Sequence, residues 1–349
     1  TMSETIPARG IPGRSSTSIL GNKVLRREDA ALLRGRGEYV ANEQFDDLLH
    51  VHFVRSSVAH GEIKSVEVGD TRVMPGVVAV YTAQDLGLDD RPPPNDDYAT
   101  EAKRPFLARD RVRFVGEPVA VVVAETAYQA ADAAEAIWVD VEPLPVVATV
   151  SDAVAADTVL FSERADNVIW EIPAKNVIDF STCEAVATAE LWNSRVAAVS
   201  IEPRVAAASY EDGRLTCWAS SQGAHDHRDE VASCLGMEPS DVRTIVKDIG
   251  GGFGAKGMVS EEEIIVGQLA RLLGRPIRWV ESRTENLTGY VHGRAQAQTV
   301  TIGGSHDGRV THYRLEVVQD SGAYPKWGAY LAEFTRNLAT GVYDIANVE

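Results

Sequence analysis

The feature that most constrains how this chain can fold is a glycine-rich segment, residues 248–257 (DIGGGFGAKG), between an expected strand and an expected helix. Its five glycines lack a Cβ atom, so the backbone can turn sharply and approach a ligand closely. Backbone N–H groups that converge in such a turn attract negatively charged or oxo groups. The segment therefore predicts a loop that holds an oxygen-rich ligand, or a tight turn that packs a helix on a sheet.

Two phosphate-binding patterns can be compared with this segment. A P-loop requires Gly-Lys and then Ser or Thr, whereas here Ala255 precedes the lysine and a glycine follows it, so that pattern fails. The dinucleotide fingerprint is nearly met as Gly250-x-Gly252-x-x-Ala255, but the candidate ribose carboxylate, Glu281, lies 31 residues beyond Gly250 instead of about 20. A nicotinamide-dependent dehydrogenase using this loop remains an alternative.

The helix expected after the loop has clear start signals. Ser260 and Glu263 predict a capping box, and Glu261 and Glu262 favour the positive end of the helix. The apolar stripe of this helix is expected to consist of Ile265, Leu269 and Leu272.

A second candidate site residue, Gln222, follows the expected strand over residues 215–219. The carboxyl ends of strands often gather ligand-binding groups. A glutamine amide can donate to an oxo atom and accept from a hydroxyl. Taken alone, Gln222 is more typical of a helix start or of the surface.

Changes in periodicity divide the chain into four stretches. Residues 1–24, rich in Gly, Pro, Ser and Thr, are expected to form a loose arm, and residues 148–175 a connector. Strand patterns and an alanine-rich helix over residues 126–136 predict an α+β domain over residues 25–147. A second, incomplete α+β domain with short strands, two helices and a long hairpin is expected over residues 176–349.

The last residues of the sequence, 343–349, resemble the start of a strand, and a sheet that ended there would expose an unpaired edge. We therefore expect the sequence to be part of something larger, as a separate subunit, a cleaved product or a piece of a longer chain. The strand patterns of the two expected α+β domains cover residues 48–54, 76–81, 112–123 (with a Gly-Glu-Pro interruption at 116–118), 137–141, 206–210, 215–219 and 242–246, and a hairpin of residues 298–302 and 310–318.

Composition excludes several classes of function. The net charge of −17 argues against a nucleic-acid partner, which would require clustered Lys and Arg. No run approaches the ~20 apolar residues of a membrane span, and no signal-peptide core occurs near the start, so a cytoplasmic location is expected. The three cysteines form no CxxC pair, which argues against a disulfide framework, an iron–sulfur cluster or a zinc site here. His225 and His227 are expected to be solvated helix residues, not metal ligands.

Taken together, these residues resemble the molybdenum-binding large subunit of the xanthine dehydrogenase, aldehyde oxidase and aerobic carbon monoxide dehydrogenase family. The first domain is similar to that family's a/b hammerhead domain, and the second to the first part of its molybdopterin-binding domain. The resemblance rests on the order and spacing of residues 27–29, 32–39, 55–60, 75–77, 113–120, 141–145, 201–203, Gln222, 250–256, 276–283, Glu285, Arg294 and 320–324.

The resemblance implies a molybdenum ion held by molybdopterin, possibly its cytosine dinucleotide form, with no metal ligand from this chain. Gln222 matches the glutamine that hydrogen-bonds a molybdenum oxo ligand. Phe253 and Gly254 match the loop whose amides face the metal's oxygen ligands, and Gly251 and Gly252 allow close approach. The implied reaction is oxidation of an aldehyde, an N-heterocycle or carbon monoxide with water as the oxygen source.

The resemblance also implies partners: an iron–sulfur small subunit, an FAD-containing medium subunit and the C-terminal half of the large subunit, assembled as a dimer of heterotrimers. The family's catalytic glutamate and second cofactor loop would lie beyond Glu349, so no catalytic residue is expected in this chain, which alone should be inactive. Gly257 occupies the place of the xanthine-type substrate glutamate. A non-catalytic half-subunit that serves assembly or cofactor delivery remains a further alternative.

Overall fold

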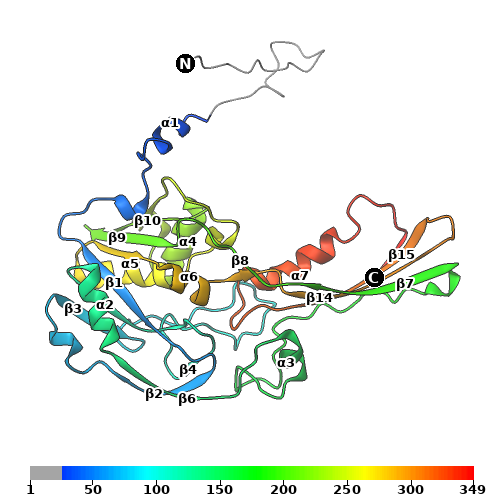
Figure 1. Ribbon diagram of the computed structural model, residues 1–349, viewed down its shortest axis with the longest axis horizontal. Coiled ribbons are helices and arrows are strands. Elements are labelled where there is room, and N and C mark those ends of the chain that lie inside the picture. Colours follow the sequence, from blue (N-terminus) through cyan, green and yellow to red (C-terminus); the bar gives the residue numbers. More distant parts are fainter. Residues whose placement is uncertain (1–25) are drawn as a thin grey trace, which may run out of the picture. The chain divides into compact units, whose positions relative to one another are not determined.

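The computed structural model describes residues 26–349 (Figure 1). The chain divides into two compact units, Thr1–Glu38 and Tyr39–Glu349. The described part of the first unit contains one short helix, α1 (Asp29–Leu32). The loose arm expected over residues 1–24 lies outside the described residues.

A seven-stranded sheet forms the centre of the second unit. Its strands are β1 (Leu49–Arg55), β3 (Val77–Thr82), β5 (Pro118–Ala124), β9 (Val205–Glu211), β10 (Arg214–Ala219), β11 (Val242–Ile245) and β12 (Ile277–Val280). They lie in the order β11-β10-β9-β12-β1-β5-β3, and β1 pairs with β12 in parallel. One sheet therefore joins strands from both stretches over which separate domains were expected.

Strand β5, which lies between β1 and the edge strand β3, contributes side chains to apolar clusters on both faces of this sheet. All seven of its residues are buried, and its valines alternate between faces: Val121 and Val123 belong to one apolar cluster and Val122 to another. On the Val122 side lies α2 (Ala127–Glu135), whose N-cap is Thr126. The expected helix over residues 126–136 is confirmed, since its small alanine face is buried and lets the helix approach the sheet closely, at Ala130, Ala133 and Ala134.

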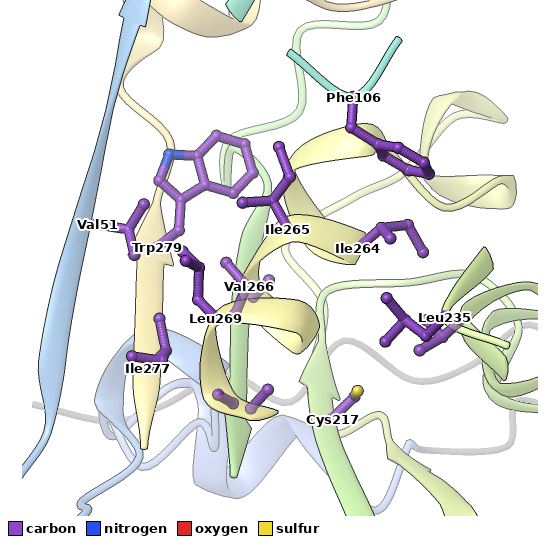
Figure 2. Close-up of a cluster of buried hydrophobic side chains, with 14 of the residues drawn as sticks. Val51, Phe106, Cys217, Leu235, Ile264, Ile265, Val266, Leu269, Ile277 and Trp279 are labelled. Carbon is purple, nitrogen blue, oxygen red and sulfur yellow. The ribbon is translucent and has the colours of Figure 1, made fainter. Parts of the chain in front are cut away.

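The opposite core surrounds α5 (Glu261–Leu273), the helix after the glycine-rich loop. Figure 2 shows Ile264, Ile265 and Leu269 of α5 between Trp279 of β12 on one side and Leu235, which follows α4 (Ala224–Cys234), on the other. The predicted capping box of Ser260 and Glu263 is present, and Gly274 ends α5 in the left-handed conformation.

The predicted apolar stripe of α5 is wrong in one residue and too narrow. Leu272 is half exposed, whereas every residue from Glu261 to Ala270 is buried. The helix contacts α4 as well as β9, β10 and β12, and Leu107 belongs to the same apolar cluster, so burial extends beyond the stripe that the sequence pattern marks. Even the three glutamates of its first turn, Glu261, Glu262 and Glu263, are buried.

A smaller three-stranded sheet in the order β4-β2-β6 consists of β2 (Gly61–Glu67), β4 (Arg111–Val112) and β6 (Trp138–Pro143). Further short elements include α3 (Val150–Ala155), α6 (Arg283–Gly289), β8 (Val196–Ala197) and β13 (His292–Gly293). No helix within residues 26–349 has both the length and the apolar character needed to cross a bilayer.

The predicted hairpin belongs to a four-stranded sheet in the order β16-β15-β14-β7, and α7 (Trp327–Leu338) packs on β15 (Figure 1). The strands are β7 (Ala185–Asn193), β14 (Gln296–Gly304), β15 (Val310–Gln319) and β16 (Asn347–Val348). The edge strand β7 was not expected from the sequence, and all nine of its residues are exposed.

Candidate functional site

The glycine-rich loop leaves β11 and reaches α5 through a single turn of 3-10 helix, Ala255–Gly257. Three of its residues have positive φ angles: Gly251 (100°), Phe253 (52°) and Gly254 (89°). Glycine adopts these angles without a steric penalty, whereas Phe253 does so at a cost of about 1–2 kcal/mol. The Phe253 ring is 78% exposed, so burial of its own side chain does not offset that cost.

The structure brings Gln222 and the loop together. The Gly254 N–H donates to Gln222 Oε1 at 2.9 Å, and the Gln222 backbone N–H donates to the Lys256 carbonyl at 2.9 Å. A Cβ atom added to Gly252 would lie 2.4 Å from Gln222 Oε1, so a larger residue there would displace the Gln222 side chain from its present position. Four of the predicted site residues therefore lie around one turn, and Gly251 precedes it.

The bond from Gly254 fixes the orientation of the Gln222 side chain. Because a backbone N–H can only donate, the amide oxygen of Gln222 must face it, and the NH₂ group is presented as a donor on the other side. Among the described residues, no protein acceptor takes a hydrogen bond from that NH₂ group, nor from the backbone N–H groups of Gly251, Gly252 and Phe253. The site thus presents four neutral donors and suits a ligand rich in oxygen acceptors.

One carboxylate holds both ends of the loop. Glu202 Oε2 accepts from the Gly250 N–H at 2.8 Å, from Ser220 Oγ at 3.0 Å and from Lys256 Nζ at 3.0 Å. Burial lowers the pKa of the Lys256 ammonium, and Glu202 opposes that shift. Neither Glu202 nor Lys256 is among the predicted site residues, although a lysine within a glycine-rich loop is a signal that the loop has a charged anchor.

A buried network of charged residues contacts the glycine-rich loop through Tyr290. Glu262 accepts from Arg204 Nη1 at 2.8 Å and from Arg55 Nη1 at 2.9 Å, and Arg204 stacks 4.1 Å over the Tyr290 ring. The Tyr290 hydroxyl donates to the Ala255 carbonyl in the loop. Burial alone would raise the pKa of Glu262, but Arg204 and Arg55 hold it well below its usual range. The network connects β1 and α5 to the glycine-rich loop.

Glu281, the ribose-binding candidate of the dinucleotide alternative, is part of this network. It is 2% exposed, and its oxygens accept from Arg204 Nε at 2.9 Å and from Asn286 Nδ2 at 2.8 Å. The carboxylate is therefore not open to a ribose hydroxyl, which removes the main support for a nicotinamide site at this loop.

The expectation that His227 is a solvated helix residue is wrong. His227 is 3% exposed, its Nδ1 lies 3.0 Å from Thr244 Oγ1, and its Nε2 lies 3.6 Å from a Glu263 oxygen. It belongs to the packing between α4, β11 and α5, whereas His225 is exposed. Within residues 26–349, no three His, Cys, Asp or Glu side chains are grouped to hold a metal ion.

Two protein-family models together match most of the chain. The chain matches the model of the aldehyde oxidase and xanthine dehydrogenase a/b hammerhead domain over residues 34–145, and that of the molybdopterin cofactor-binding domain over residues 160–349. The expected fold, an α+β hammerhead domain followed by the first part of a molybdopterin-binding domain, is thereby confirmed.

Individual relatives agree with the family models. The chain is 36% identical to the nicotine 6-hydroxylase large subunit of Paenarthrobacter nicotinovorans, over 95% of this chain and 42% of the relative, and 33% identical to the carbon monoxide dehydrogenase large chain of Afipia carboxidovorans, over 93% and 43%. The crystal structure of quinoline 2-oxidoreductase from Pseudomonas putida 86 superposes with a TM-score of 0.84 at 34% identity, over 94% of this chain and 43% of that one. The chain thus spans about two fifths of these relatives' length.

Proposed function

We propose that the glycine-rich loop and Gln222 of this chain, which belongs to the family of molybdopterin-binding large subunits of molybdenum-dependent oxidoreductases, hold the oxygen ligands of a molybdenum–molybdopterin cofactor. The family models and relatives from several enzymes of this type show the membership. The assignment of individual residues to the cofactor rests on the geometry of the loop.

Four donors without an acceptor among the described residues, all in or beside one loop, carry the proposal. The NH₂ group of Gln222 and the free N–H groups of Gly251, Gly252 and Phe253 come from two separate segments of the chain, yet the Gly254–Gln222 hydrogen bond fixes them together. All four are neutral donors, which suits oxo ligands on a metal held by its pterin and not by protein side chains. The residues therefore fit the cofactor that the family implies.

These donors would act by orientation and by electrostatic stabilisation. Bound at this loop, the cofactor would supply the two-electron oxidation and the activated water that the family reaction uses. The Gln222 NH₂ group would fix the orientation of an oxygen ligand. The free backbone amides would stabilise negative charge on it, at no cost of reorganisation because the loop is already held in place. The general base is expected in the part of the family's large subunit that this chain does not cover.

The complete enzyme would oxidise an N-heterocycle, an aldehyde or carbon monoxide. Relatives named nicotine 6-hydroxylase, aldehyde oxidoreductase and carbon monoxide dehydrogenase support this range of substrates without selecting one. We further propose iron–sulfur and FAD subunits as the electron acceptors, which agrees with relatives named as subunits of complexes. The exposed strand β7, with Leu191 and Trp192, and the exposed ring of Phe253 provide surfaces that the rest of such an assembly would cover.

The substitution Gly252→Ala tests the proposed site in the complete enzyme. A Cβ atom there would lie 2.4 Å from Gln222 Oε1, so either the glutamine or the loop must move. We expect a clear fall in molybdenum bound per protein, measured by mass spectrometry of the metal, and in substrate oxidation. Gly293→Ala is the matched control, because the nearest atom to its added Cβ is 4.0 Å away. Normal molybdenum content and activity in Gly252→Ala would refute the assignment.

A further inference from the structure

We infer that Glu202 and Lys256 are positioning residues for the cofactor's oxygen ligand: their buried ion pair fixes the position of the loop amides relative to the Gln222 amide. We call these two residues, with their hydrogen bonds to Gly250, Ser220 and Gln222, the brace. The inference rests on the proposed function, because it concerns the group that the loop and Gln222 would hold.

The brace closes the loop at both ends through one oxygen atom. Glu202 Oε2 accepts from the Gly250 N–H, where the loop begins, and from Lys256 Nζ, where it ends. The backbone is tied at the same points, since the Glu202 N–H donates to the Gly250 carbonyl at 3.2 Å and Lys256 Nζ donates to the Glu202 carbonyl at 2.9 Å. The donors of Gly251, Gly252 and Phe253 lie between these two fixed ends.

The same brace holds the segment that carries Gln222. Ser220 Oγ donates to Glu202 Oε2 at 3.0 Å, and the Gln222 backbone N–H donates to the Lys256 carbonyl at 2.9 Å. Gln222 is thus connected to the loop on its backbone side through Lys256 and on its side-chain side through Gly254. A shift of Glu202 or Lys256 would move the Gln222 NH₂ group relative to the loop amides.

Burial makes this pair sensitive to substitution. Lys256 is 3% exposed, and the Glu202 side chain is 11% exposed. Among the described residues, the other Glu202 oxygen, Oε1, is buried and accepts from no protein group, so the carboxylate acts entirely through Oε2. Removing one charge leaves the other uncompensated in a site of low polarity, and the loop must move or open to hydrate it.

Glu202→Gln and Lys256→Met in the complete molybdenum enzyme test the inference. Both preserve approximate side-chain size and remove one charge. A misplacement of about 1 Å can cost ~100-fold in rate, so we expect at least a tenfold slower reduction of the enzyme by substrate. We also expect an altered electron paramagnetic resonance spectrum of the molybdenum centre and faster hydrogen exchange at the amides of residues 250–256. A purely structural role would lower thermal stability but leave the spectrum unchanged.

The matched controls are Glu142→Gln and Lys64→Met, which break an exposed 2.7 Å ion pair of the same residue types in the small sheet. They should change none of these readouts. Ser220→Ala removes one hydrogen bond of the brace and no charge. If Glu202→Gln does not fold, the same readouts are measured on Ser220→Ala instead. Unchanged spectra, rates and loop exchange in the brace variants would overturn the inference. Absence of molybdenum from the unaltered enzyme would instead refute the proposed function, while loop exchange would still report on the brace.

Discussion

Replacement of Arg204 by methionine tests whether the buried ion pairs of Arg204 with Glu262 and Glu281 stabilise the fold. Arg204 is 2% exposed and donates from its guanidinium to two carboxylates, those of Glu262 and Glu281. Without it, Glu262 keeps its ion pair with Arg55, and among the described residues Glu281 keeps the Asn286 amide and a backbone N–H as donors. Breaking a buried ion pair on one side typically costs about 3–5 kcal/mol, and we expect Arg204→Met to lie in that range.

The assay for Arg204→Met is urea-induced unfolding followed by tryptophan fluorescence, which Trp279 makes sensitive to this region because the Arg204 guanidinium lies 5.0 Å from its ring. Arg109→Met is the control. The 3.1 Å pair between Arg109 and Asp90 is more than 30% exposed on both sides, so its loss should cost less than about 1 kcal/mol. A loss of under about 1 kcal/mol in Arg204→Met would refute the view that this network stabilises the fold.

Two further predictions concern α5. Burial opposes ionisation of Glu261, but Arg104, Lys326 and Arg91 together lower its pKa from 4.5 to about 2. This carboxylate therefore stabilises the fold fully above about pH 5 and loses that contribution, roughly 3 kcal/mol, as the pH falls toward 2. Glu261→Gln should flatten the acid limb of unfolding free energy against pH, and an unchanged limb would contradict the assignment. Leu269→Ala should lower the free energy of unfolding by about 2–5 kcal/mol in urea, because Leu269 is fully buried. Leu272→Ala should lower it by less than half as much, because Leu272 is half exposed. Equal losses would contradict this difference in burial between the two leucines.

Local sequence rules predicted the elements that depend on near neighbours. The capping box of Ser260 and Glu263 and the alanine face of α2 follow from spacings of three and four residues, and the structure has both. Gln222 and the glycine-rich loop were linked through the family resemblance, and the Gly254–Gln222 hydrogen bond brings them together.

Features that depend on distant partners could not be read from periodicity. Arg55 and Glu262 are separated by 207 positions, so neither the ion pair nor the burial of Glu262 has a local signature. His227 and Leu272 were assigned to the wrong environments for the same reason: a helical position is buried or exposed according to what packs on it. The parallel pairing of β1 with β12 likewise joins segments that no short-range pattern connects.

In the proposed site, Gln222 presents its NH₂ group, and the glycine-rich loop its unpaired amides, to an oxygen ligand of the molybdenum cofactor. An experimental structure of the complete enzyme with its cofactor would measure the distances from these donors to the metal's oxygen ligands. We predict Gln222 Nε2 and at least one free backbone N of Gly251, Gly252 or Phe253 within about 2.7–3.2 Å of oxygen atoms bound to the metal. A cofactor held elsewhere, with these donors facing solvent or another part of the protein, would contradict it.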